Sequence, residues 1–128
     1  MKSWSFFFLF SCTLVFLPVS THAARLSNYK GWEKVEVLAT AYCPCSKCCG
    51  KHANGVTAIG NNAYTKGVAV DRSIIPLKST VKIPGYGIVT ADDVGGAIKR
   101  NRIDVRFNSH KKALKWGRQT LVVYYKTP

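Results

Sequence analysis

Carboxylates are scarce in this chain, so the few that it has are the first candidates for acid–base chemistry. Aspartate and glutamate together number 6, against 19 lysines and arginines, and the net charge is +13. The acidic residues are Glu33, Glu36, Asp71, Asp92, Asp93 and Asp104. Cleavage of a glycosidic bond by hydrolysis ordinarily needs two carboxylates, one as the acid and one as the base or nucleophile. The two glutamates fall at the N-terminal edge, so any such chemistry has to draw on the aspartates.

Asp104 lies in an alternating segment, 102–107, in which the odd positions are apolar and the even positions are charged. This period of two predicts a half-buried strand. The apolar side chains are expected to face a core, and Asp104 to face outward between Arg102 and Arg106. On pattern alone, an exposed strand with solvated charges is favoured.

Asp92 and Asp93 end an apolar run that Gly95 and Gly96 follow. Successive side chains of a strand point to opposite faces, so Asp92 and Asp93 are not expected to share a site. Asp71 ends a short apolar segment. It could serve a site, or it could only cap the turn that follows.

The N-terminal stretch 1–23 is interpreted as a secretory signal peptide. It has a short positive start, an apolar core too short for a comfortable membrane span, and a small residue, Ala23, at the expected cleavage position. Residues 24–33 are expected to be a flexible lead-in, and 34–128 a single domain. No later segment is long and apolar enough for a membrane helix. A charge of +13 would suggest nucleic acid in a cytosolic protein, but export favours an anionic envelope polymer or surface.

Four cysteines fall within seven residues: Cys43, Cys45, Cys48 and Cys49. In an oxidising compartment the favoured interpretation is two disulfides, with Cys48 and Cys49 each bonded back to Cys43 or Cys45. A thiolate site for zinc or copper(I) is the second interpretation, with His52 as a further ligand. Four ligands so close in sequence wrap awkwardly around one ion, so no metal is predicted. A catalytic cysteine ranks third.

Short alternating or β-branched segments separated by Gly and Pro turns dominate the rest of the chain. We expect strands over 34–42, 67–71, 79–84, 88–92, 102–107 and 118–125. A short helix is expected over 110–116, ended by Gly117. This pattern predicts a small, mostly β barrel or sandwich.

The three aspartates also carry a resemblance to a known family. Val-Ala-Val-Asp71, Asp93-Val-Gly-Gly-Ala-Ile-Lys99 and Arg-Ile-Asp104-Val resemble the 3D domain, named for its three aspartates and found in small muralytic stationary-phase factors. The second run also resembles the catalytic barrel of membrane-bound lytic transglycosylase A. Further matches lie at 39–43, 75–77, 83–87 and 117–118, so the resemblance covers roughly 35–125. It implies a six-stranded double-psi β-barrel with one or two short helices.

The resemblance also implies an activity. The protein is expected to be an exported lytic transglycosylase that cleaves the MurNAc–GlcNAc β-1,4 bond of peptidoglycan and leaves a 1,6-anhydro product. Asp104 would be the general acid/base, with Asp93 and Asp71 orienting it, binding sugar hydroxyls or stabilising the transition state. Like charges would raise the pKa of Asp104, and Arg102 and Arg106 would lower it. Activity should fall as the pH rises above mildly acidic.

Substrate contacts are expected from Thr40, which matches the family motif, and from Tyr42, Tyr86 and Lys99. Core packing is the alternative for each tyrosine. The expected partner is a peptidoglycan glycan strand or another anionic envelope polymer, with no nucleic acid and no cofactor. A non-catalytic, expansin-like polysaccharide-binding barrel is the alternative function.

Two features depart from the family pattern. Arg100 stands where glycine is usual after Ala-Ile-Lys, which costs strain if the backbone φ is positive there. The transglycosylase also has a second domain facing the barrel, for which this chain has no room. A homodimer, in which a second copy completes the cleft, is therefore one arrangement to test.

Overall fold

The computed structural model describes residues 30–128. The predicted signal peptide over 1–23, and residues 24–29 of the predicted lead-in, lie outside the described residues. Within 30–128, no helix has the length and apolar character needed to cross a membrane.

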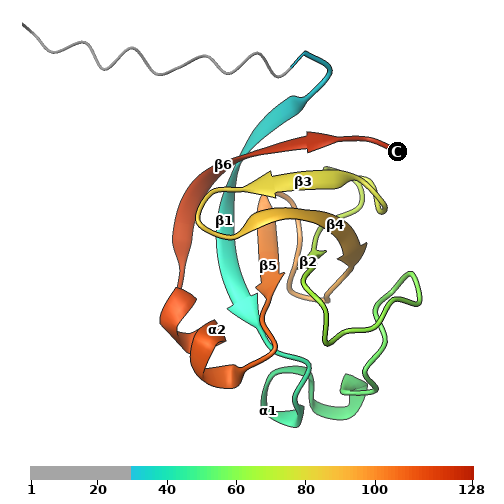
Figure 1. The fold of residues 1–128 in the computed structure, drawn as a ribbon, viewed down its shortest axis with the longest axis vertical. Coiled ribbons are helices and arrows are strands. Elements are labelled where there is room, and N and C mark those ends of the chain that lie inside the picture. The colour runs from blue at the N-terminus through green and yellow to red at the C-terminus, as the bar shows by residue number, and fades with distance from the viewer. Residues whose placement is uncertain (1–29) are drawn as a thin grey trace, which may run out of the picture.

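Six strands form the framework of the structure (Figure 1). They are β1 (Glu33–Tyr42), β2 (Val68–Ala69), β3 (Thr80–Ile83), β4 (Gly87–Asp93), β5 (Arg102–Arg106) and β6 (Gln119–Lys126). Each corresponds to an expected segment, and most boundaries shift by only one or two residues. β2 is shorter than expected, and its register with β4 shifts between Val68 and Ala69.

The strands close into a barrel in the order β1-β5-β2-β4-β3-β6. β1 runs parallel to β5 and β2 runs parallel to β4, whereas the other neighbouring strands are antiparallel. Strands that are adjacent in the barrel are therefore mostly not consecutive in the sequence, unlike those of an up-and-down barrel. The prediction of a mostly β, six-stranded double-psi barrel is confirmed.

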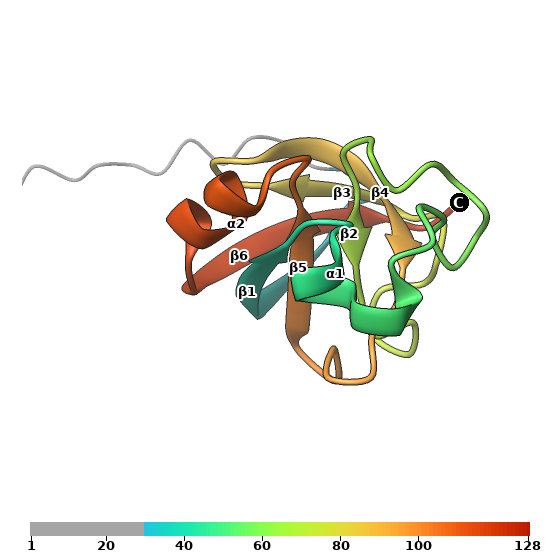
Figure 2. The same cartoon turned by 90° about the horizontal axis from the view of Figure 1, so that it is seen from below.

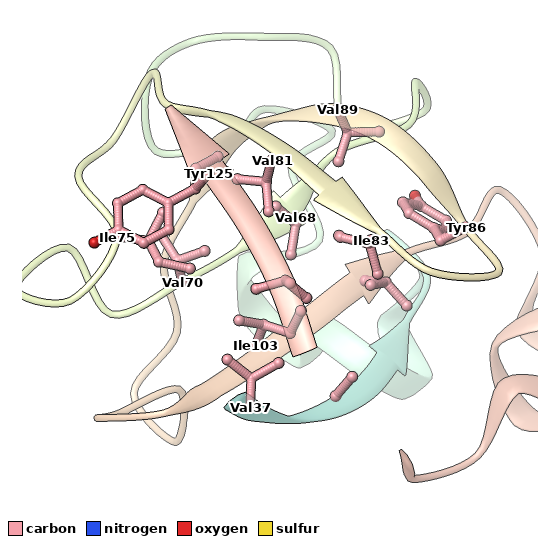
Figure 3. Close-up of a cluster of buried hydrophobic side chains, with 14 residues drawn as sticks. Val37, Val68, Val70, Ile75, Val81, Ile83, Tyr86, Val89, Ile103 and Tyr125 are labelled. Atoms are coloured by element: carbon pink, nitrogen blue, oxygen red, sulfur yellow. The ribbon is translucent and has the colours of Figure 1, made fainter. Parts of the chain in front are cut away.

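Apolar side chains from all six strands fill the barrel (Figure 3). Ile103 and Val105 of β5 are buried in it, as the alternation predicts, and Phe107 packs against its edge. Branched side chains dominate this core, as expected for closely packed strands. Packing in the core determines which side chains of β1, β2, β4 and β5 point inward. It thereby also determines which polar side chains point outward at one end of the barrel.

Two short helices flank that end (Figures 1 and 2). α2 (His110–Trp116) follows β5 and ends at Gly117, whose φ of 68° suits glycine, and both features were expected. α1 (Ser46–Cys49) and the 3-10 turn η1 (Gly50–His52) follow β1. The sequence predicted a loop there. The cysteine-rich segment therefore forms a compact turn where the parallel strands β1 and β5 end.

Candidate active site

A row of four residues crosses four neighbouring strands at one level of the sheet. Thr40 of β1 pairs with Asp104 of β5, Asp104 pairs with Ala69 of β2, and Ala69 pairs with Asp93 of β4. Neighbouring strands lie roughly 4.8 Å apart, so strand pairing alone brings these distant parts of the chain together. The small Ala69 separates the two acids and leaves space above the sheet.

A cleft of about 780 Å³ opens over three residues of this row, Asp104, Ala69 and Asp93, whereas Thr40 lies outside its lining. Its walls include Tyr42, Asp71, Asp93, Lys99 and Asp104, and the segment from His52 to Ala58 contributes to one side. The three aspartates of the expected site thus line one cleft. A volume of this size is within the usual range for ligand pockets, roughly 300–1,000 Å³.

Asp104 is half-buried in this cleft. Its Oδ1 accepts a hydrogen bond of 2.9 Å from the hydroxyl of Thr40. Its Oδ2 accepts none from residues 30–128. Burial raises the pKa of the Asp104 carboxyl and outweighs the opposing effects of the Thr40 hydrogen bond and of Arg102. The environment therefore favours a protonated Asp104 at a higher pH than an exposed aspartate would allow.

Both oxygens of Asp93 are occupied by hydrogen-bond donors. Oδ1 accepts the backbone N–H groups of Ala58 at 3.1 Å and Val94 at 3.0 Å. Oδ2 accepts the hydroxyl of Tyr42 at 2.7 Å. Burial, followed by this hydrogen bond, raises the pKa of Tyr42, so its hydroxyl remains a donor. Asp93 thus ties the loop around Ala58 to the barrel and orients Tyr42.

Both oxygens of Asp71 are also occupied, one by its own turn and the other by the backbone of Arg100. Its Oδ1 accepts the hydroxyl of Ser73 at 2.7 Å and the Ser73 backbone N–H at 3.0 Å. Its Oδ2 accepts the N–H of Arg100 at 2.7 Å. The Ser73 hydroxyl, with these N–H groups, lowers the pKa of Asp71 to about 2. Arg100 has a φ of 58°, so the departure from glycine does place a side chain in a strained region.

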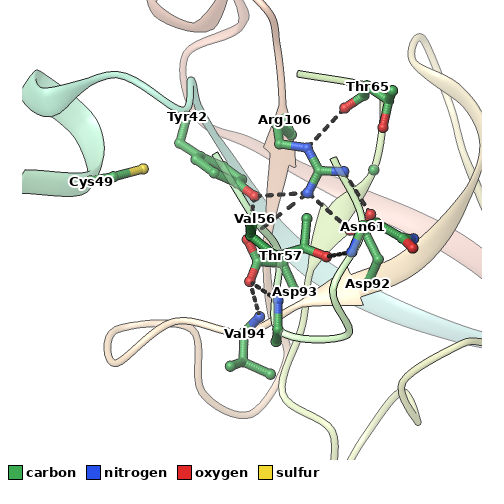
Figure 4. A network of polar contacts seen from close by, with 12 residues as sticks. Tyr42, Cys49, Val56, Thr57, Asn61, Thr65, Asp92, Asp93, Val94 and Arg106 are labelled. Atoms are coloured by element: carbon green, nitrogen blue, oxygen red, sulfur yellow. Dashed lines mark hydrogen bonds and ion pairs between the residues drawn. The ribbon is translucent and has the colours of Figure 1, made fainter. Parts of the chain in front are cut away.

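Arg106 is buried, although the alternation of residues in β5 predicted that it faces solvent. It is 1% exposed and forms an ion pair with Asp92, itself 2% exposed, with Nη2 and Oδ2 2.6 Å apart (Figure 4). Its Nε donates to the carbonyl of Thr65 at 2.8 Å, and its Nη1 donates to the Tyr42 hydroxyl at 3.1 Å. The expectation that Arg106 faces outward beside Asp104 is therefore corrected. The segment at 65–67 covers this end of β5, so its outer face is buried.

Gly67 allows that close covering. A Cβ at this position would lie 2.5 Å from Asp92 Oδ1, closer than real Cβ atoms approach. Tyr86 supports the same segment, because its hydroxyl donates to the carbonyls of Gly67 and Arg106. Tyr86 is 6% exposed and packs edge-on against Phe107 and Trp116. The structure places Tyr86 in the core and outside the cleft lining, in agreement with the packing alternative.

The four cysteines of the predicted disulfide loop are free thiols in the structure. The Cys43 and Cys48 sulfurs lie 3.4 Å apart, and the Cys49 sulfur donates to the Cys43 carbonyl. Cys48, Cys49 and His52 line the cleft. His110, which the sequence gave no reason to select, lies beside Cys43, Cys45 and Cys48. The pairing into disulfides stays a prediction.

Comparison of the sequence with known protein families gives a match that includes the cleft aspartates. Residues 66–126 match the sequence model of the 3D domain. The chain is a 3D-domain protein. The matched segment contains all three cleft aspartates, whereas β1, with Thr40, Tyr42 and the cysteines that follow, precedes it.

Curated relatives of this 3D-domain protein occur in Bacillus subtilis (strain 168). YabE, named for cell wall shaping, is 43% identical over 98 residues, which cover 76% of this chain and 24% of YabE. The cell wall-binding protein YocH is 42% identical over 104 residues, covering 78% and 35%. YorM, an SPbeta prophage-derived protein, is 38% identical over 108 residues, covering 78% and 45%. The chain therefore spans less than half the length of each of these relatives.

Proposed function

We propose that this 3D-domain protein acts on the cell wall as a peptidoglycan lytic transglycosylase, with Asp104 as its single acid/base. The names of two relatives refer to cell wall shaping and cell wall binding, which supports a peptidoglycan-associated role and an envelope or extracellular location. The exposed Arg72 and Lys99 on the cleft wall suit an anionic polymer with peptide carboxylates.

One observation carries the choice of reaction. Of the three aspartates that line the cleft, Asp104 alone has a carboxylate oxygen that accepts no hydrogen bond from residues 30–128. A hydrolase needs a second carboxylate to activate water or attack the sugar. Asp93 and Asp71 are committed to donors that hold loops in place. The site therefore offers one available acid and two positioning acids.

A transglycosylase needs only that one group. Protonated Asp104 donates its proton to the glycosidic oxygen as the bond from that oxygen to the anomeric carbon breaks. The hydroxyl on C6 of the same sugar then attacks the anomeric carbon and closes the 1,6-anhydro ring. Its proton passes to the Asp104 carboxylate, which restores the acid. Because the attack is intramolecular, no activated water is consumed.

The raised pKa of Asp104 suits the first step, because the group must carry a proton when the glycan binds. The Thr40 hydroxyl donates to Oδ1 of Asp104. Oδ2 accepts no hydrogen bond from residues 30–128 and is the oxygen proposed to transfer the proton. Asp93 would act through Tyr42 and the loop at Ala58, and Asp71 through the turn that ends near Arg100. Tyr42 and Lys99, both on the cleft wall, are the proposed glycan contacts.

The test is product analysis. Purified protein is incubated with isolated peptidoglycan sacculi, and the released fragments are identified by mass spectrometry. Anhydro-muropeptides are the expected products, and Asp104→Asn should reduce their release by about 10²–10⁴-fold. Fragments with reducing ends would show a hydrolase instead. Sacculi that bind the protein but yield no fragments would support the expansin-like alternative.

A further inference from the structure

A cluster of three thiols and one imidazole lies beside the cleft and has no part in the proposed reaction. Cys43, Cys45 and Cys48 come from the turn after β1, and His110 is the first residue of α2. All four ligand atoms lie within 4.8 Å of one another. We propose that this cluster binds one Zn²⁺ as a structural site.

The distances fit a tetrahedron. The Cys43 and Cys48 sulfurs are 3.4 Å apart. His110 Nδ1 lies 3.6, 3.8 and 3.4 Å from the sulfurs of Cys43, Cys45 and Cys48. A zinc ion with Zn–S bonds of about 2.3 Å and a Zn–N bond of about 2.0 Å places its ligand atoms about 3.5–3.8 Å apart. The four atoms thus already surround a space of the required size.

The barrel topology explains why the ligands meet. β1 and β5 are parallel neighbours, with Tyr42 paired to Arg106 and the Phe107 N–H bonded to the Tyr42 carbonyl. Their ends coincide, so the cysteines that follow β1 lie beside the His110 that follows β5. The fourth ligand comes from another segment, which removes the difficulty of wrapping four cysteines so close in sequence around one ion.

The ligand set indicates the metal. Three thiolates and one imidazole in four-coordinate geometry are typical of structural zinc, and four protein ligands leave no position open for substrate or water. Cys49 lies outside the tetrad, because its sulfur donates to the Cys43 carbonyl. Two disulfides would instead consume Cys49 and leave His110 without a function.

The bound ion would fix one wall of the cleft. Cys48, Cys49 and His52 line the cleft from α1 and η1, and the cluster joins Cys48 of α1 to His110 at the start of α2. A metal held there would stabilise the wall against which a glycan lies. This role holds whether or not the cleft is catalytic, because it concerns the position of the wall and no step of the reaction.

Metal content tests the proposal directly. The full-length protein, purified without chelators, is analysed by native mass spectrometry and elemental analysis, and one zinc per chain is expected. Cys45→Ser and His110→Ala should lose the metal. The matched controls Cys49→Ser and His52→Ala, which change the same residue types outside the tetrad, should keep it. A chelator should lower the Tm of the parent protein but not that of His110→Ala.

Cobalt substitution covers the case in which a variant fails to fold. Co²⁺ added to metal-free parent protein should give the intense visible spectrum of a tetrahedral site with thiolate ligands. Failure to bind Co²⁺, or a weak six-coordinate spectrum, would overturn the proposal. So would a purified metal-free chain with a Cys43–Cys48 disulfide, stoichiometric copper in place of zinc, or loss of zinc in Cys49→Ser as complete as in Cys45→Ser. None of these readouts depends on peptidoglycan cleavage.

Discussion

Two aspartates at the same end of the barrel, Asp92 and Asp104, have opposite surroundings. The carboxylate of Asp92 and the guanidinium of Arg106 are almost inaccessible to solvent, and their hydrogen bonds are satisfied by each other, by Thr65 and by Tyr42. Asp104, on the same strand as Arg106, is half-buried with one oxygen free of partners among residues 30–128.

The buried pair of Asp92 and Arg106 suits a role in stability, whereas Asp104 suits a role in proton transfer. A buried charge with every hydrogen bond satisfied cannot accept or donate a proton at low cost, but it holds its neighbours in one arrangement. A half-buried acid with an open oxygen and a raised pKa contributes little to stability, but it is available to a substrate. Arg106 links the two regions, because it holds the Tyr42 hydroxyl that in turn contacts Asp93.

The largest predicted effect is on activity, from Asp104→Asn. Loss of the only available acid should reduce release of anhydro-muropeptides by about 10²–10⁴-fold. Stability should not fall. Because burial raises the pKa of Asp104, the folded protein loses stability as the pH rises through that pKa, and the neutral amide removes this loss. Denaturant unfolding at mildly alkaline pH should show a variant at least as stable as the parent, and a clearly less stable one would contradict the comparison.

The same chemical change in the other region should act on stability. Asp92→Asn removes the close, buried partner of the Arg106 guanidinium and leaves Asp93, whose Oδ2 lies 3.9 Å from Nη1, as a more distant counter-charge. This loss should lower the free energy of unfolding by about 3–5 kcal/mol. Urea unfolding followed by fluorescence measures this change. The double variant Asp92→Asn/Arg106→Met, which removes both charges, should recover part of the loss. If Asp92→Asn proved as stable as the parent, the pair would not have the structural role assigned here.

Thr40→Val tests whether the pKa of Asp104 controls the pH dependence of activity. The Thr40 hydroxyl bonds to Asp104 and lowers the pKa of its carboxyl, so its removal should raise that pKa further. The alkaline fall in activity should then move to higher pH, measured as initial rates of muropeptide release across a pH series. Thr80→Val, at an exposed position of β3 outside the cleft lining, should leave the profile unchanged. A shift to lower pH would refute the assignment of Asp104 as the acid.

The smallest effect is expected at Arg100, on the Asp71 side of the cleft. Arg100→Gly relieves a φ of 58°, while the backbone N–H that Asp71 accepts remains. The free energy of unfolding should rise by about 1 kcal/mol. Arg118→Gly, where φ is not positive, should instead be neutral or destabilising. Thermal unfolding of both variants measures the contrast, and an unchanged or lower Tm for Arg100→Gly would exclude strain at this position.

The alternation of apolar residues was sufficient to locate the strands. Ile103 and Val105 are buried because a strand has only two faces and one of them meets the core. The helix at 110–116 and its glycine end were equally readable, since capping depends on local backbone geometry. Opposite roles for Asp92 and Asp93 followed from the same rule of alternation.

The burial of Arg106 could not be predicted from the alternation of apolar and charged residues. The period of two places it on the same face as Asp104, and only the covering segment at 65–67 buries that face near the end of β5. Tyr86 was ambiguous for a similar reason, because a tyrosine beside glycines suits either a cleft or a core.

Local sequence patterns were enough to locate the strands and the turns, and the family motifs selected the three aspartates. Tertiary structure decided which of their oxygens stays available, which arginine is buried and which histidine meets the cysteines. The physical reason is that strand formation depends on the neighbouring few residues, whereas these contacts depend on strand pairing. The pairing of β1 with β5 unites residues more than sixty positions apart, and no local pattern encodes that distance.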